Sequence, residues 1–231
     1  MNTALRRALA ALLCFLLLFS LAACPAPGGT GDEDDAYTLT RVSTGVYRCE
    51  ETGVVYHRAP DCYLPGQMSR RPYAIYESDA TRDVYFRLGA ESADKYLVLA
   101  DERDHYPYHF IVAEDYDMPT LTEMEVSEVW ICVADAERFW ADANVISKMR
   151  LGERVNFVVA AYRDGEAAPL PTGTPEVCVQ LIFRSEKYTE FYYYCTYYSF
   201  GEGACYLYEF ETERCVRVAD DLFDGYALEM K

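Results

Sequence analysis

The sequence predicts an α+β protein that is predominantly antiparallel β, with two β-rich subdomains and one amphipathic helix packed on the second. β-branched and aromatic residues, including 21 tyrosines, recur in short blocks separated by Gly, Pro and Asp, which is typical of strands and turns. One apolar stripe has the period of a helix. Pro119 follows an acidic stretch and divides the folded region into residues 37–118 and 119–231.

The N-terminal segment has the three parts of a secretory signal. Arg6 and Arg7 precede an almost wholly apolar stretch, 8–21, and small residues then lead to Cys24. The stretch is shorter than the roughly 20 residues that a membrane-spanning helix needs. No later segment approaches that length, so we expect no integral membrane domain.

The tetrad Leu21-Ala22-Ala23-Cys24 resembles the lipobox of bacterial lipoproteins. In that family, a peptidase cleaves just before the cysteine after its thiol has received a diacylglycerol. The resemblance implies that residues 1–23 are a signal peptide and that Cys24 is the acylated N-terminus. It also implies a lipid-anchored domain on the extracytoplasmic side of a bacterial membrane. An ordinary signal peptide and an uncleaved anchor are the alternatives.

Residues 24–36 are predicted to be a flexible tether between the acylated cysteine and the folded region. They are rich in Pro and Gly and end in an acidic run, Asp32-Glu33-Asp34-Asp35, without the defined loop of a Ca²⁺ site. The whole chain has a formal net charge of −17. This charge argues against nucleic acid or anionic lipid surfaces as partners and would attract cations or basic polymers.

Strands are predicted in the first subdomain near residues 37–49, 53–58, 73–77, 83–88, 95–100 and 108–113. The first two would form a hairpin that turns at Glu51-Thr52-Gly53, where Gly53 can adopt a positive φ. Short strands at this spacing suggest a meander or a small barrel.

The second subdomain is predicted to begin with a strand near 124–133, followed by the helix. Asp135 is the expected N-cap and Gly152 the expected stop. The apolar stripe of this helix consists of Phe139, Ala143, Ile146 and Met149. Further strands are predicted near 153–163, 176–184, 187–198, 204–210 and 214–218.

A tyrosine-rich hairpin is the most unusual feature of the predicted fold. Pairing 187–198 with 204–210 through a loop at 199–203 places Tyr194 opposite Tyr208. We assign the even-numbered face to the core because the odd-numbered face also carries polar residues such as Glu209 and Arg217. A one-residue slip would invert this assignment.

An open odd-numbered face would present Phe191, Tyr193 and Tyr197 as an aromatic platform. Such rings suit a glycan, a peptide or a protein partner, so these residues are the predicted ligand-binding site. The alternative is that the three rings simply pack within the sheet or against the helix.

The cysteines and histidines give no recognisable catalytic or metal motif. Seven cysteines follow Cys24, namely Cys49, Cys62, Cys132, Cys178, Cys195, Cys205 and Cys215. A disulfide between Cys49 and Cys62 is one alternative, and burial as small apolar residues is another. His105 and His109 flank Pro107 near acidic residues, but we predict no metal. His57 lies near Asp61 and Cys62, yet no orienting partner for a nucleophile is evident.

Function therefore stays open among three classes, and the sequence predicts no cofactor. The preferred hypothesis is a surface-tethered binding or interaction module whose partner is an envelope glycan, a peptide or a protein. A cell-envelope hydrolase with an unrecognised active site is the second, although no motif of hydrolases or nucleotide-binding proteins is present. A structural or inhibitory lipoprotein that acts on another envelope protein is the third.

Overall fold

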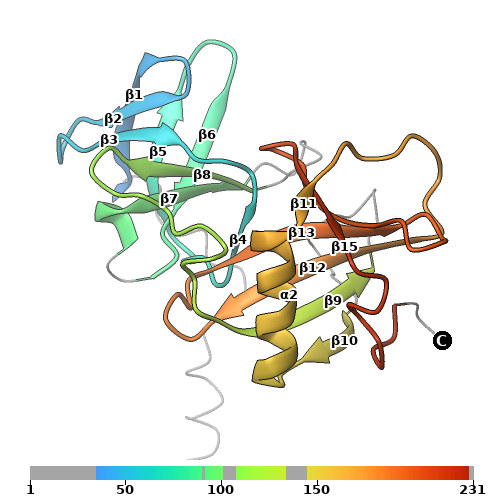
Figure 1. The fold of residues 1–231 in the computed structure, drawn as a ribbon. Helices are drawn as coiled ribbons and strands as arrows, with labels where there is room; N and C mark the ends of the chain where they lie inside the picture. Colours follow the sequence, from blue (N-terminus) through green and yellow to red (C-terminus); the bar gives the residue numbers. More distant parts are fainter. Residues whose placement is uncertain (1–34, 90–91, 101–107, 134–144, 229–231) are drawn as a thin grey trace, which may run out of the picture.

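A computed structural model describes residues 35–89, 92–100, 108–133 and 145–228. The described part is mostly β, with largely antiparallel sheets and one α-helix, so the predicted fold class is confirmed at that level. A closed barrel lies beside a second, open sheet (Figure 1). No helix in these ranges is long and apolar enough to cross a membrane.

Seven strands form the barrel, in the order β1-β2-β3-β8-β7-β6-β5. They are β1 (Tyr37–Ser43), β2 (Val46–Cys49), β3 (Val55–Arg58), β5 (Pro72–Glu77), β6 (Arg82–Phe86), β7 (Tyr96–Ala100) and β8 (Tyr108–Ala113). Parallel pairing of β1 with β5 closes the barrel. Gly53 (φ 75°) lies in the predicted turn between β2 and β3, whereas Gly45 (φ 71°) divides the predicted strand 37–49 into two.

The second sheet has the order β10-β9-β12-β13-β14-β15-β11, and β4 (Tyr63–Pro65) also pairs with β13. Its other strands are β9 (Val126–Val133), β10 (Val145–Met149), β11 (Glu166–Ala167), β12 (Val177–Ser185), β13 (Phe191–Ser199), β14 (Cys205–Glu209) and β15 (Arg214–Val218). A short 3₁₀ helix, η2 (Ser92–Asp94), precedes β7. Because β4 comes from the first half of the chain, the sheet combines segments from both sides of Pro119.

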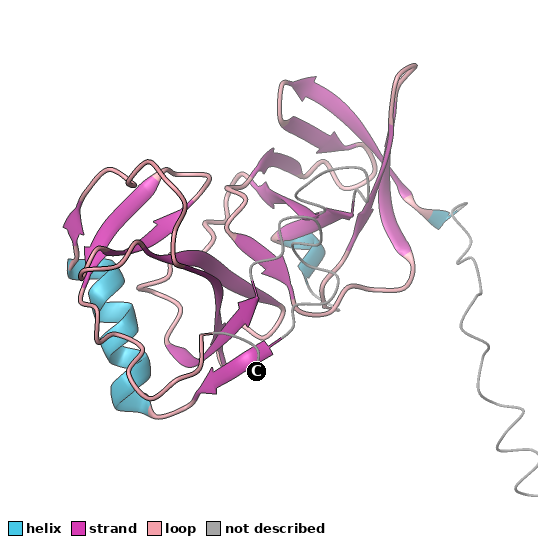
Figure 2. Ribbon diagram, turned by 90° about the vertical axis from the view of Figure 1, so that its right-hand side faces the viewer, coloured by secondary structure: helices cyan, strands magenta, loops and turns pink. Residues whose placement is uncertain are grey.

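The α-helix, α2 (Gly152–Asp164), lies against one face of this sheet (Figure 2). Val155, Val158 and Tyr162 are its buried residues, and they follow one another at helical spacing. Glu153 in the first turn and Arg163 in the last turn suit the helix dipole. Tyr162 is thereby placed on the sheet-facing side of the last turn.

The predicted position of the helix is wrong. Ile146 and Met149 belong to strand β10, which pairs with β9, and Gly152 begins the helix instead of ending one. The predicted N-cap Asp135, together with Phe139 and Ala143, lies outside the described residues. The valines of 153–163 suggested a strand, but a helical stripe facing an apolar sheet outweighs their β propensity.

The core assignment of the tyrosine-rich hairpin is also wrong. β13 and β14 pair two residues away from the predicted register, with Thr196 opposite Tyr208, which leaves the faces unchanged. The prediction places Glu209 and Arg217 on one face, but β14 and β15 pair one residue away from that arrangement, with Leu207 opposite Val216. This slip moves Val216 to the odd-numbered face of β13 and Arg217 to the even-numbered face. The odd-numbered face is therefore the apolar one, and α2 covers it.

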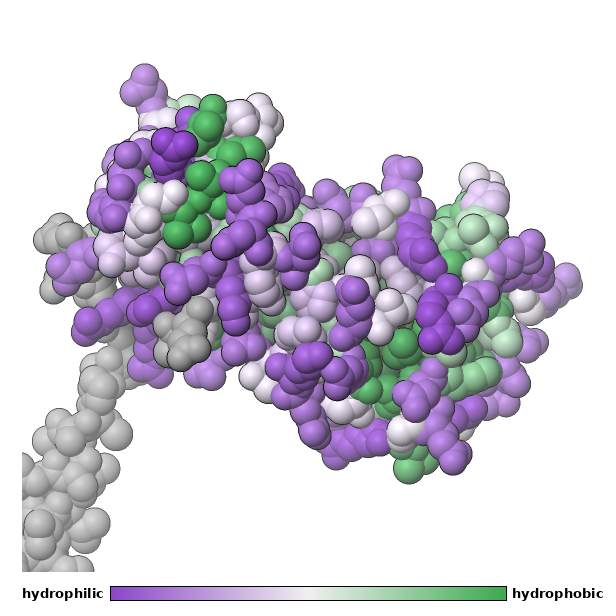
Figure 3. All heavy atoms as spheres, turned by 60° about the vertical axis from the view of Figure 1, so that its left-hand side comes forward, coloured by the Kyte–Doolittle hydropathy of each residue, from purple (hydrophilic) through white to green (hydrophobic). Residues whose placement is uncertain are grey.

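One apolar cluster joins the barrel to the sheet, and a separate cluster fills the barrel. Phe191 of β13 contacts Tyr63, Tyr96 and Phe110 edge-on, with ring centres 5.5 to 6.3 Å apart. Hydrophilic residues predominate on the face shown in Figure 3, where hydrophobic residues form separate small areas. The large aromatic surface of the chain is thus used mainly for internal packing.

The segment between β3 and β4 links the barrel to the sheet. Asp61 accepts a hydrogen bond from Arg58 at 2.5 Å and lies 3.1 Å from Nδ1 of His109. The Tyr194 hydroxyl donates to the backbone carbonyl of Asp61, and the Tyr194 backbone N–H donates to the carbonyl of Cys62. These contacts hold Cys62 and Tyr63 beside β13, where they line a cavity.

Candidate functional site

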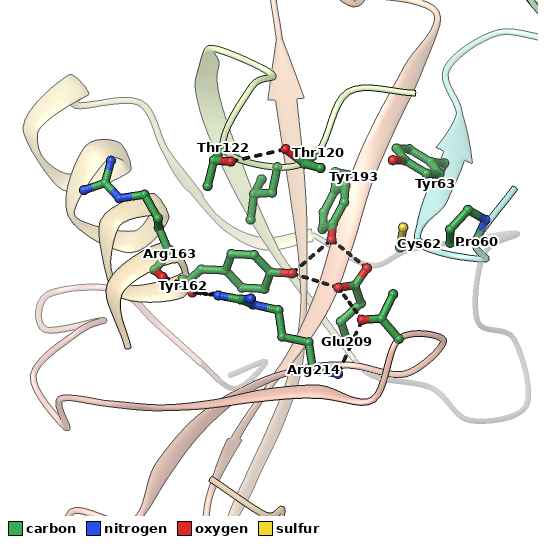
Figure 4. Close-up of a pocket in the computed structure, with 12 residues that line it drawn as sticks. Pro60, Cys62, Tyr63, Thr120, Thr122, Tyr162, Arg163, Tyr193, Glu209 and Arg214 are labelled. Atoms are coloured by element: carbon green, nitrogen blue, oxygen red, sulfur yellow. Dashed lines mark hydrogen bonds between the residues drawn. The ribbon is translucent and has the colours of Figure 1, made fainter. Parts of the chain in front are cut away.

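A cavity of about 600 Å³ opens between α2, the β13–β14 pair and the segment that leads into β4 (Figure 4). The rings of Tyr63, Tyr162 and Tyr193 line it together with Glu209. Its lining also includes Pro60, Cys62, Thr120, Leu121, Thr122, Arg163, Thr212 and Arg214. The cavity therefore combines aromatic walls with a small number of polar groups, which is typical of ligand sites.

Glu209 is the polar centre of this cavity and is only 4% exposed. Its Oε2 accepts hydrogen bonds from the hydroxyls of Tyr162 at 2.7 Å and Thr212 at 2.8 Å. Its Oε1 accepts a hydrogen bond from the Tyr193 hydroxyl at 2.6 Å. Figure 4 shows these donors converging on the carboxylate from three segments of the chain. Hydrogen bonds to a charged acceptor are the strong class, so they can hold a buried carboxylate in place.

Local structure explains why these donors converge. Tyr162 lies in the last turn of α2, Tyr193 lies on the face of β13 that α2 covers, and Glu209 ends β14. Thr212 lies in the turn that follows Glu209, before β15 begins. The register of the sheet brings Tyr193 and Glu209 to the same end of the covered face, where α2 adds Tyr162 and the turn adds Thr212.

The two tyrosines are protonated at neutral pH and therefore act as donors. Burial raises the pKa of Tyr193, and the neighbouring Cys62 and Glu209 raise it further. Burial also raises the pKa of Tyr162, although its contact with Tyr193 acts in the opposite direction. The two hydroxyl oxygens lie 3.1 Å apart. Since each hydroxyl has one proton and a hydrogen bond to Glu209, its oxygen is left as an acceptor.

The two arginines of the cavity are engaged elsewhere. Arg163 donates to both carboxylate oxygens of Asp164, at 2.7 and 2.6 Å. Arg214 donates to the backbone carbonyls of Tyr162 and Arg163, and its guanidinium lies 4.8 Å from the centre of the Tyr162 ring. Among the described residues, the side-chain donors to Glu209 are Tyr162, Tyr193 and Thr212, so the carboxylate is held by neutral groups.

Cys62 lines the cavity but is a poor nucleophile there. Burial raises the pKa of its thiol, and the nearby Glu209 raises it further, whereas nucleophilic cysteines need a lowered pKa. Asp61 bonds to Arg58 and His109, so it is engaged away from any Cys62 reaction. The described geometry thus gives no support to a His57–Cys62 nucleophile.

The structure corrects the predicted aromatic platform. Phe191, Tyr193 and Tyr197 are 0%, 4% and 3% exposed, because α2 and the shared core cover their face of β13. Tyr197 packs on Phe223 and donates to the sulfur of Cys205 at 3.2 Å. Only Tyr193 of the three lines the cavity.

The sequence did not predict that Tyr162 and Glu209 belong to the site. Tyr162 was assigned to a strand, and Glu209 was used only as evidence of an exposed face. The helical spacing of Val155, Val158 and Tyr162 was the one signal that could have placed Tyr162 on a buried face. Nothing local in the sequence indicated that Glu209 is buried.

The remaining predicted site residues give mixed outcomes. Cys24 and His105 lie outside the described residues. All seven cysteines after Cys24 are free thiols, six of them buried, so a Cys49–Cys62 disulfide is not formed. Within the described ranges, no three His, Cys, Asp or Glu side chains are grouped closely enough to hold a metal ion.

Comparison of the chain with protein-family models, with curated proteins and with solved structures finds no match. The function must therefore be argued from the geometry of the chain itself.

Proposed function

We propose that the chain is a lipid-anchored binding module on the extracytoplasmic side of a bacterial membrane, and that the Glu209 cavity holds its ligand. The lipobox-like tetrad ending at Cys24 supports the anchor, and the Pro/Gly-rich residues that follow it would give the domain reach. The observation that carries the binding site is the convergence of three hydroxyl groups on the buried carboxylate of Glu209.

The ligand of this cavity is a small molecule or peptide end that carries an ammonium group. Tyr162, Tyr193 and Thr212 donate to Glu209, which leaves their oxygens as acceptors. The carboxylate and these oxygens form an acceptor-rich floor that favours a ligand with hydrogen-bond donors and a positive charge, while Arg163 and Arg214 on the wall donate to Asp164 and to backbone carbonyls. The tyrosine rings provide faces that attract cations.

The same features favour binding over hydrolysis. A glycosidase mechanism needs two carboxyl groups that flank the scissile bond. Glu209 is the one carboxylate in the described lining of this cavity, and the thiol of Cys62 has a raised pKa. The groups present can hold a cation but do not supply a nucleophile with its base.

A ligand panel tests the proposed binding site. Thermal melting of the purified chain is measured with primary amines, short peptides, envelope glycans and divalent metals. A ligand at a hundred times its dissociation constant adds about 2.7 kcal/mol of stability, which raises the melting temperature visibly. We expect a shift with amines or free peptide N-termini. A panel that gives no shift, or only a glycan shift, contradicts the ammonium proposal.

Variants of the cavity locate the binding. Glu209→Gln removes the negative charge with little change of shape and should abolish amine binding, while Glu211→Gln removes a charge from a neighbouring exposed position and should not. Thr122→Lys is the second variant, because Thr122 is exposed on the cavity wall and its substitution leaves the buried network intact. Its ammonium should weaken amine binding by repulsion. Equal affinity in all of these proteins would place the amine elsewhere.

The anchor needs a separate test. Cys24→Ala should prevent incorporation of a labelled fatty acid and release the chain from membranes in a bacterial host. Continued labelling and membrane association of this variant would contradict a lipid anchor at Cys24.

A further inference from the structure

A second cavity, of about 400 Å³, lies at the opposite face of the sheet, at the end of β9 and β12. Arg150, Arg184 and Glu128 line it, together with the hydroxyl residues Ser185 and Thr189 and the exposed Glu186. Glu128 shares its face of β9 with Trp130 and Cys132, whereas Val129 and Ile131 face α2. No residue of this cavity belongs to the Glu209 cavity.

Arg184 is held in one position by its neighbours. Its guanidinium lies 4.3 Å from the centre of the Trp130 ring and 4.9 Å from that of the Tyr192 ring. Its Nη1 donates to Glu128 at 3.1 Å. Contact with two adjoining aromatic rings and a hydrogen bond to a carboxylate fix the planar guanidinium at the cavity wall.

Positive charge exceeds negative charge in this region. Arg150 donates through Nε to the other carboxylate oxygen of Glu128 at 2.6 Å, so both oxygens of Glu128 are occupied. Lys148 adds a third cation, 4.1 Å from the centre of the Trp130 ring. The cavity lining holds two arginines and two glutamates, and Lys148 beside Trp130 brings the cations of this region to three, in a chain with a formal net charge of −17. Such a local excess of positive charge attracts anions.

Hydrogen-bond donors also exceed acceptors. The Nε of Arg184 is buried and has no acceptor in the described part of the chain, and the buried Nε1 of Trp130 is directed toward Glu128 without a well-formed hydrogen bond. Buried donors without acceptors are uncommon, and each is a reason to look for a missing partner. The Ser185 oxygen already accepts backbone N–H groups from Lys187 and Tyr188, which leaves its proton to donate. The terminal nitrogens of Arg150, on a side chain that is 70% exposed, complete the donor set.

We propose that this second cavity binds the oxyanion of a small ligand, a carboxylate or a phosphate group, through Arg150 and Arg184. The ligand would accept hydrogen bonds from the free nitrogens of Arg150 and from Ser185, while the stacked Arg184 supplies charge. A planar carboxylate or a phosphate matches the fork of an arginine. This proposal is independent of the Glu209 cavity.

Titration of the purified chain with inorganic phosphate and with acetate, at constant ionic strength, tests the proposal. The reporter is the indole N–H resonance of Trp130, one of two tryptophans in the chain, assigned with Trp130→Phe. We expect a saturable shift with phosphate, acetate or both. Saturation with phosphate alone would identify a phosphate ligand, and saturation with acetate alone a carboxylate ligand. No saturable shift with either anion would overturn the proposal.

A matched pair of variants locates the anion. Arg150→Gln should lower the affinity roughly tenfold or more, because it removes charged donors from the cavity. Arg48→Gln removes the same charge from an exposed position on β2 of the barrel and should leave the affinity unchanged. Glu186→Gln should raise the affinity by removing a negative charge from the rim. Equal affinities in Arg150→Gln and Arg48→Gln would show that the anion binds elsewhere.

Discussion

Glu209 and Glu128 lie on opposite faces of the second sheet, and their hydrogen-bond partners differ. On the face that α2 covers, Glu209 accepts hydrogen bonds from three hydroxyls, which are neutral. On the opposite face, Glu128 accepts hydrogen bonds from two arginines. Neutral donors leave the charge of Glu209 in place, whereas the arginines more than balance the charge of Glu128.

This difference gives the two cavities opposite ligand chemistry. The proposed ligand of the Glu209 cavity would meet a buried carboxylate and hydroxyl oxygens, and the proposed ligand of the second cavity would meet the N–H groups and charge of two arginines. A carboxylate therefore does not by itself indicate a cation site. The protons and charges of the groups around it decide what can bind.

The largest expected difference is in stability. Glu209→Ala leaves the buried hydroxyls of Tyr162 and Tyr193 without an acceptor and should lower the free energy of unfolding by about 3 kcal/mol or more. Glu128→Ala should cost about 1 kcal/mol, because Arg150 is 70% exposed and returns to water. Urea denaturation measures both values. Glu211→Ala is the exposed control, and a larger loss in Glu128→Ala than in Glu209→Ala would contradict the comparison.

Adjacent tyrosines on β13 give a sharper test of the same contrast. Tyr193→Phe removes a 2.6 Å hydrogen bond to Glu209 and should cost about 1.5 kcal/mol. Tyr192→Phe removes only a 3.4 Å contact with Arg184 on the opposite face and should cost less than about 0.5 kcal/mol. Both changes delete one oxygen atom from one strand. Similar losses in urea denaturation would mean that the two networks contribute equally to stability.

The barrel was easier to predict from the sequence than the sheet. Its strands are joined in large part by short turns, and Gly53 indicates one such turn directly. Local sequence thus carries most of the information that sets the order of β1, β2 and β3. The sheet instead depends on β4, which comes from the other half of the chain, and on the one-residue register between β14 and β15.

The candidate site could be predicted only in part for the same reason. Tyr193 was named, but as a member of an exposed platform. Glu209 and Tyr162 are 47 residues apart and belong to different elements, so only the packing of α2 on the sheet brings them together. The run Val158-Val159 favours a strand locally, but packing of the apolar helix stripe on the sheet stabilises a helix instead. The buried carboxylate receives hydrogen bonds from Tyr162 and Tyr193, which are distant in sequence and which no local pattern links to Glu209.

The hydrogen bonds around Glu209 and those around Glu128 should lose their contribution to stability at opposite ends of the pH range. Burial raises the pKa of Tyr193 and of Tyr162 above the ordinary value of about 10. Above that pH the unfolded chain loses these protons while the folded chain keeps them, so stability falls as the pH rises. Burial alone would raise the pKa of Glu128, but Arg150 and Arg184 lower it below its ordinary value. Its contribution is therefore present above that value and is lost as the pH falls through the folded pKa.

Melting temperatures measured across the pH range test whether stability falls at high pH through the tyrosines and at low pH through Glu128. Tyr193→Phe should flatten the alkaline decline, and Glu128→Gln should flatten part of the acid decline. Asp61 contributes to the acid decline as well, because hydrogen bonds from His109 and Arg58 outweigh its burial and lower its pKa. An alkaline decline that is unchanged in Tyr193→Phe would indicate that other buried tyrosines dominate it.

The smallest expected effect is the difference in stability loss between substitutions of the two arginines of the second cavity. Arg150→Gln should change the free energy of unfolding by less than about 0.5 kcal/mol, because its side chain is largely exposed. Arg184→Gln should cost about 1 kcal/mol more, since Arg184 is 33% exposed and stacks on two rings. Urea denaturation of both variants measures the difference. If Arg150→Gln were as costly as Arg184→Gln, Arg150 would be part of the cavity wall and its nitrogens would not be free to bind an anion. A small cost is what the proposed role requires, because a side chain that stabilises the fold little can exchange water for a ligand.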